Sequence, residues 1–259
     1  MKKVFSLFTI AFVSMFALVL GVNAKDVTDA TELNDCLANE SVCTLTADIN
    51  ADAVVPADKT VTLELNGNDL TAVNGDAIYV TKGATLTIKG EGNVIATKTD
   101  YAAVFNNGTV TIDGGTFKRD VAGNTNKWYV ILNHGIMTIN DATVTIDHED
   151  EIVSGSHPSL VDNGYSNFTS SNERSGYITD DSVNHKNPSL TVNGGEFIGG
   201  LNTIKNDDNS VLEINGGTFK NTVQVSLMNW NIATINGGTF ETPTGNDKTN
   251  IFVGNAGTD

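Results

Sequence analysis

Paired carboxylates and two arginines are the residues of this chain that could take part in acid–base chemistry. Asp180 and Asp181 are adjacent, Asp120 follows Arg119, and Arg174 lies close to the two adjacent aspartates. Two carboxyl groups can act as general acid and general base on a glycosidic bond only when they flank that bond. Adjacent aspartates in turns are more often solvated turn formers. We therefore consider these five residues as catalytic candidates. The alternative is that they are solvated residues that only form turns.

The acidic run from 147 to 151 could bind a metal ion. Its carboxylates, Asp147, Glu149, Asp150 and Glu151, offer the oxygen ligands that calcium prefers. The run lacks the glycine-punctuated spacing of a dedicated calcium loop, so a solvated acidic segment is the alternative. The four histidines, His134 among them, lack metal-ligand spacing and are expected in exposed loops. Motifs for nucleotide binding and for a catalytic nucleophile are absent. The only cofactor that we consider is calcium at the acidic run.

A long insertion between 164 and 188 is the first place to look for a binding site. Long loops on rigid scaffolds carry function disproportionately. The residues in it that suit contact with a ligand are Tyr165, Phe168, Arg174, Tyr177 and His185.

These side chains must be positioned by a repeated unit. The motif Ile235-Asn-Gly-Gly-Thr-Phe240 recurs with small changes in copies that begin at Ile214, Val192 and Ile112. Weaker copies begin at Leu65, Ile88 and Ile139. Successive copies are 21 to 27 residues apart, except for one oversized step of 53. A short period with strand chemistry and glycine turns predicts a solenoid, in which each repeat buries its apolar face against its neighbours.

Each repeat holds three short alternating strands and has no room for a crossover helix. The predicted fold is therefore all-β, a right-handed single-stranded parallel β-helix of about seven to eight rungs over 43–259. Residues at equivalent turns should stack from rung to rung. This predicts a polar ladder of Asn66, Asp113, Asn140, Asn193, Asn215 and Asn236, and an apolar column of Phe117, Phe197, Phe219 and Phe240.

The N-terminus adds two features to the repeats. Residues 1–24 have a basic start, an apolar middle and a small-residue end, which predicts a secretory signal peptide; an uncleaved anchor is the alternative. Residues 25–42 should hold a helix that caps the open end of the solenoid. In an exported protein, Cys36 and Cys43 most simply form a disulfide that ties this cap to the first strand.

The opening of the mature chain resembles that of a known family. A short amphipathic helix, the strand Thr44–Ile49 and the segment Val55–Gly67 are similar to the start of many secreted proteins of the pectate-lyase-like right-handed β-helix superfamily. The Asn-Gly-Gly-Thr-Phe repeats also resemble those of bacterial surface proteins with this fold. The resemblance implies possible polysaccharide cleavage, with calcium-binding carboxylates beside an Arg or Lys base. No column of aspartates accompanies Arg119, so that pattern cannot be transferred residue by residue.

The net charge of the chain limits the classes of partner that it can bind. The formal net charge is −16, and it becomes −18 when Lys2 and Lys3 leave with the signal peptide. Such a surface repels nucleic acids and anionic membranes. We expect a secreted or cell-surface protein with no membrane span after cleavage and with an extracellular glycan or surface protein as partner. Another subunit or a further segment should cover the last rung. A non-catalytic adhesin is the main hypothesis, and a lyase or hydrolase of uronic-acid polymers is the alternative.

Overall fold

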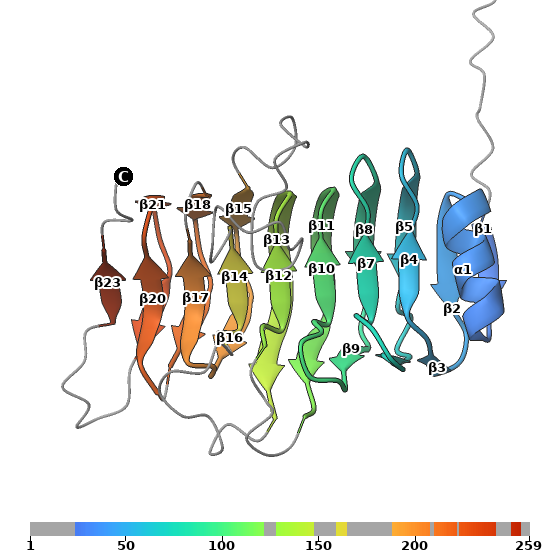
Figure 1. Cartoon of the computed structure of the whole chain (residues 1–259), viewed down its shortest axis with the longest axis horizontal. Coiled ribbons are helices and arrows are strands. Elements are labelled where there is room, and N and C mark those ends of the chain that lie inside the picture. Colours follow the sequence, from blue (N-terminus) through green and yellow to red (C-terminus); the bar gives the residue numbers. More distant parts are fainter. Residues whose placement is uncertain are drawn as a thin grey trace, which may run out of the picture.

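The computed structural model describes residues 24–121, 128–147, 159–164, 188–207, 210–221, 223–241 and 250–254. Figure 1 shows strands stacked side by side along one long axis, with a single helix at the N-terminal end. Every strand pair is parallel, and the described chain makes about seven turns. The prediction of an all-β parallel β-helix with an N-terminal helix is therefore confirmed.

Each turn contributes to three faces. The first face contains β1 (Ala24–Val27), β2 (Val42–Leu45), β5 (Thr60–Glu64), β8 (Thr85–Lys89), the first halves of β11 (Thr109–Arg119) and β13 (Ile136–Ile146), β15 (Ser189–Val192), β18 (Val211–Ile214) and β21 (Ile232–Ile235). The second face contains β3 (Ile49–Asn50), β6 (Leu70–Thr71), β9 (Asn93–Ala96), the second halves of β11 and β13, β16 (Glu196–Ile198), β19 (Thr218–Lys220) and β22 (Thr239–Glu241).

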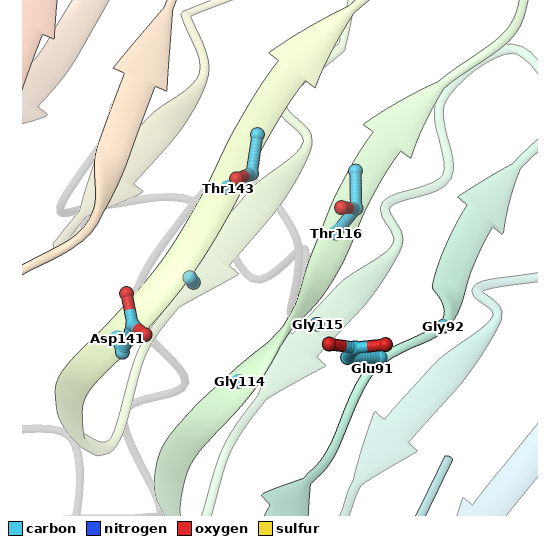
Figure 2. A pocket seen from close by; sticks show the side chains of 8 residues that line it. Glu91, Gly92, Gly114, Gly115, Thr116, Asp141 and Thr143 are labelled. Atoms are coloured by element: carbon cyan, nitrogen blue, oxygen red, sulfur yellow. The ribbon is translucent and has the colours of Figure 1, made fainter. Parts of the chain in front are cut away.

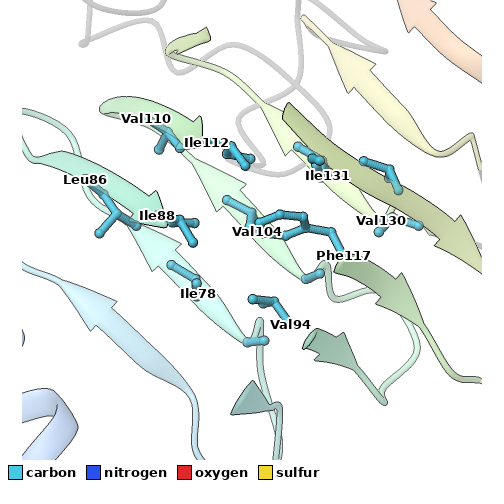
Figure 3. Close-up of a cluster of buried hydrophobic side chains, with 14 of the residues drawn as sticks. Ile78, Leu86, Ile88, Val94, Val104, Val110, Ile112, Phe117, Val130 and Ile131 are labelled. Atoms are coloured by element: carbon cyan, nitrogen blue, oxygen red, sulfur yellow. The ribbon is translucent and has the colours of Figure 1, made fainter. Parts of the chain in front are cut away.

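The third face is a separate sheet of eight strands. Its strands are β4 (Ala53–Val55), β7 (Ile78–Val80), β10 (Val104–Asn106), β12 (Ile131–Asn133), β14 (Val161–Asn163), β17 (Asn202–Asn206), β20 (Val225–Asn229) and β23 (Ile251–Val253). All three faces send aliphatic side chains inward, because alternate residues of a strand point to opposite sides. In Figure 3, Ile112 of the first face, Phe117 of the second and Val104 of the third lie in one buried core.

The N-terminal helix α1 (Ala30–Asn39) lies within the range expected for the cap, and β1 precedes it. Asp29 is its N-cap, because its carboxylate accepts hydrogen bonds from the backbone N–H groups of Thr31 and Glu32. Leu33 and Leu37 form its buried face. The predicted disulfide between Cys36 and Cys43 is present and joins α1 to β2. The expected signal peptide lies outside the described residues, apart from Ala24.

The predicted polar ladder runs along the corner between the first and second faces. Asn140 donates to Asp113 at 2.6 Å, and the side-chain amides of Asn193, Asn215 and Asn236 each donate to the residue one turn earlier, at 2.7, 2.9 and 2.8 Å. Asn66 is not part of this ladder. The register pairs Glu64 with Lys89 and Lys89 with Asp113, so Asn66 lies two residues beyond the ladder position, and its side-chain amide donates to the carbonyl of Leu45.

The phenylalanine column is shorter than predicted. Phe197, Phe219 and Phe240 stack with ring centroids 4.9 Å apart at each step. Phe117 is fully buried but does not touch this stack, because Val144 lies between it and Phe197 in the register. An aliphatic residue on the oversized repeat therefore divides the column into two parts.

A second ladder, which we did not expect, lies at the corner between the third and first faces. Each asparagine except the last donates its side-chain amide to the next one along the solenoid at 2.7 or 2.8 Å. All five residues are buried, and four of them also donate to a backbone carbonyl of the next turn. This inner ladder consists of Asn106, Asn133, Asn163, Asn206 and Asn229.

Candidate functional site

A surface groove of about 210 Å³ lies where the first face turns into the second. Figure 2 shows Glu91 and Asp141 on opposite sides of the strand segment that carries Gly114 and Gly115. The hydroxyl-bearing residues Thr116 and Thr143 are register partners on β11 and β13 and form one wall. We call this feature the corner groove.

Local irregularity in the repeat creates the groove. The copy from Ile88 to Val94 is one residue longer than the copy from Ile112 to Phe117, although both ends of the two copies pair in register. The extra length lies in the corner that carries Glu91. The pairing of β11 with β13 shifts around Asp113, as a β-bulge does, and bulges re-aim neighbouring side chains.

Glycine is required at the floor of the groove. Gly115 has φ of 93°, and a Cβ atom there would lie 2.8 Å from Cδ1 of Leu65. A larger residue would therefore strain the backbone and collide with the core. The glycines keep the floor low between the two flanking carboxylates.

The corner groove is rich in hydrogen-bond acceptors and contains no basic side chain among its lining residues. Its polar groups are two exposed carboxylates, two threonine hydroxyls and the glycine backbone. Such a set suits a ligand that donates hydrogen bonds, such as a neutral polyol. It lacks the cation that would be needed to hold an anionic polymer without a bridging metal.

A second group of ionisable residues is buried on the outer side of the third face. Asp162 of β14 is 1% exposed, and the Nζ atom of Lys205 on β17 lies 4.0 Å from its Oδ1. Lys205 pairs more closely with Asp207, at 2.5 Å. Burial raises the pKa of Asp162 to about 8, which Lys205 opposes and Asp207 reinforces. Burial also raises the pKa of Tyr129 well above its usual value.

Apolar residues lie beside these buried charges. Phe105 and Leu132 point away from the main core yet are at most 1% exposed, and they form a separate cluster with Ala102 and Tyr129. His134 was expected in an exposed loop, but it is 1% exposed and its ring lies edge-on to Phe105, with centroids 5.3 Å apart. This part of the third face is thus a second packed layer and not an open binding surface.

Arg119, a candidate base, points into the solenoid. It is fully buried, and its guanidinium donates to the backbone carbonyls of Lys98 and Tyr101. Burial lowers the pKa of Arg119 to about 10, and Asp100 and Asp76 oppose this shift. The arginine therefore secures the corner after β11. The neighbouring Asp120 is exposed, so the two residues do not form a surface pair.

The remaining predicted site residues fall largely outside the described part of the chain. Asp147 is described: its carboxylate lies 3.7 Å from Nζ of Lys118. Among the described residues, no group of three or more potential metal ligands is present. Residues outside the described ranges include the other calcium candidates Glu149, Asp150 and Glu151, the catalytic candidates Asp180 and Asp181, and the loop residues Tyr165, Phe168, Arg174, Tyr177 and His185.

Comparisons with protein-family models, curated proteins and solved structures gave no match. The class of protein is therefore defined by its own structure, as a parallel β-solenoid with one disulfide. Within the described ranges, no helix is long and apolar enough to cross a membrane.

Proposed function

We propose that this chain is an exported, non-catalytic β-helix of the pectate-lyase-like type that binds a neutral glycan at a cell surface or in a matrix. The corner groove is the observation that carries the proposal. It places carboxylate and hydroxyl acceptors on both sides of a glycine floor, where successive sugar hydroxyls could donate hydrogen bonds.

Charge favours a neutral ligand over a uronic-acid polymer. Glu91 and Asp141 line the groove of a chain whose formal net charge is −16, so an anionic polymer would be repelled unless a divalent cation bridged the carboxylates. Arg119 is unable to serve as a surface base while its guanidinium is buried against Lys98 and Tyr101. These observations favour binding over cleavage, while a lyase or hydrolase stays the alternative.

Two further proposals concern location and partners. Export to the cell surface or beyond rests on the basic and apolar segment at residues 1–24 and on the disulfide. At the C-terminal ends of the two sheets, Ile235 of β21 and Val253 of β23 are 41% and 71% exposed. A subunit or another segment that covers these side chains would remove an open sheet edge.

The test is binding of the purified protein to a panel of neutral and acidic oligosaccharides, measured by calorimetry with and without calcium. We expect at least one neutral oligosaccharide to bind, and the double variant Glu91→Gln with Asp141→Asn to weaken that binding at least tenfold. The control Asp120→Asn changes an exposed carboxylate outside the groove lining and should bind as the wild type does.

Polymer size provides the readout for the alternative. Each polysaccharide is incubated with the protein, and its size is followed by chromatography. Shortening of any polymer would establish cleavage and overturn the non-catalytic proposal. Binding that is unaffected by the groove variant would overturn the assignment of the corner groove.

A further inference from the structure

Threonines form a regular array on the outer side of the first face. Five consecutive strands, β5, β8, β11, β13 and β15, place a threonine at one register position. The first three of these strands place another threonine two residues earlier. We call these eight residues the threonine array: Thr60, Thr62, Thr85, Thr87, Thr109, Thr111, Thr138 and Thr191.

The array points outward because the residue between each pair points inward. Val61, Leu86 and Val110 are at most 2% exposed and belong to the core. The threonines beside them are exposed or partly exposed. The strands run parallel and their pairing shows no shift within this region, so β5, β8 and β11 present the same Thr-x-Thr pattern in line. Figure 1 shows β5, β8, β11 and β13 in succession along the solenoid.

The spacing of the array is fixed by sheet geometry. Neighbouring strands lie about 4.8 Å apart, and residues two apart on one strand are separated by about 6.6 Å. Threonine is β-branched, so its χ1 rotation is restricted and the methyl and hydroxyl groups of a column can repeat one orientation. The result is a two-dimensional lattice of hydroxyl and methyl groups on a rigid surface.

The chemistry of the array excludes most other ligands. None of its eight members carries charge, although the chain as a whole has a formal net charge of −16. An ionic ligand would therefore find no counter-charge on the array itself, whose border at the next outward position is formed by Glu64, Lys89 and Asp113. None of the eight is aromatic, so the array offers no ring on which a sugar could stack. A ligand that matches this surface must be uncharged, donate and accept hydrogen bonds, and repeat in two directions.

We propose that the threonine array is an ice-binding surface. Water in ice is uncharged, offers both donors and acceptors, and repeats over distances of several ångströms, comparable to those of the array. Threonine hydroxyls can occupy positions in such a lattice, while the methyl groups hold neighbouring waters in ordered cages. The rigid sheet lowers the conformational entropy lost on adsorption, because the contacting groups are already fixed before binding. This inference does not depend on glycan binding at the corner groove.

The array also has defined limits. The earlier of the two positions is taken by Ile136 on β13 and by Ser189 on β15. Glu213 on β18 then interrupts the longer column with a charge. The surface proposed to contact ice therefore extends from β5 to β15, and it is complete in both columns over β5, β8 and β11.

The experiment uses the purified protein and measures ice growth directly. Thermal hysteresis and the shape of single ice crystals are recorded, and adsorption of fluorescently labelled protein to an ice surface is followed. We expect measurable hysteresis, faceted crystals and adsorption for the wild type. Thr87→Lys, which introduces a long charged side chain at the centre of the array, should lower hysteresis at least fivefold.

The matched control is Thr218→Lys on β19. Thr218 is a partly exposed threonine on the second face and lies outside the array. Thr87→Ser provides a milder change, which removes the methyl group while keeping the hydroxyl, and should lower hysteresis at least twofold. Circular dichroism establishes that each variant is folded. Absence of hysteresis and adsorption in the folded wild type, or equal losses in Thr87→Lys and Thr218→Lys, would overturn the proposal.

Discussion

The buried carboxyl group of Asp162 should make the stability of this protein fall as pH rises. Burial raises its pKa from 3.8 to about 8 in the folded protein, while the unfolded chain keeps the ordinary value. Between these two values the folded state holds a proton that the unfolded state has released. The stabilisation that this bound proton gives is therefore complete below the pKa of Asp162 in the unfolded chain, and it is lost as the pH rises through the pKa of Asp162 in the folded protein.

The magnitude follows from proton linkage. One proton difference changes the free energy of unfolding by about 1.4 kcal/mol per pH unit, so raising the pH from about 5 to about 8 should cost about 4 kcal/mol. Tyr129, Lys205 and Asp207 interact electrostatically with this carboxyl. Lys205 does not restore the usual pKa, because it lies 2.5 Å from Asp207 and 4.0 Å from Asp162.

Urea unfolding at several pH values tests this prediction. Asp162→Asn keeps the shape of the side chain and removes its titration, so the variant should have a flatter pH profile and greater stability than the wild type near pH 8. Asp120→Asn, at an exposed site, is the control and should keep the wild-type slope. The wild type and both variants carry the same four histidines. Equal slopes in the wild type and Asp162→Asn would refute the reasoning.

Three further predictions concern the scaffold. Asn163→Ala should lower the free energy of unfolding by about 2–4 kcal/mol, because it leaves its buried ladder partners unsatisfied. Asn215→Ala, on the exposed outer ladder, should lower it by less than about 1 kcal/mol. Urea denaturation distinguishes the two variants. Replacing Cys36 and Cys43 by serine should cost about 2 kcal/mol, visible as a lower Tm that reducing agent no longer changes. Arg119→Met should destabilise the protein by about 2–3 kcal/mol, because two charge-assisted hydrogen bonds are lost. The same denaturation assay measures this loss, and the affinity for glycan should stay within twofold of the wild type.

Several structural features could be predicted from the sequence repeat alone. A ladder from Asp113 to Asn236 could be predicted because stacked turns place equivalent residues one above another. The same reasoning included Asn66, but the pairing register places Glu64 and not Asn66 in line with Lys89 and Asp113. The phenylalanine column is interrupted for another reason, because Val144 lies between Phe117 and Phe197 in the register. Such breaks depend on pairing register, which has to be known turn by turn.

The inner ladder and the corner groove escaped prediction for different reasons. Asn106 and its equivalents recur at uneven intervals, since the loops between them differ in length, and their aliphatic-x-Asn pattern is the signal that could have found them. Glu91 reaches the groove because its copy of the repeat is one residue longer. The longer copy was visible in the sequence, but its spatial consequence required the neighbouring turns.

The sequence by itself determined the solenoid, its three-strand turn, the capping helix and the disulfide, because these depend on local periodicity and on short separations along the chain. The tertiary structure decided which side chains face water. It placed Arg119 inside the corner, His134 and Asp162 in a buried layer, and eight threonines on one outer face. Those outcomes depend on contacts between turns, whose register and burial are settled only when all three faces close around a common core.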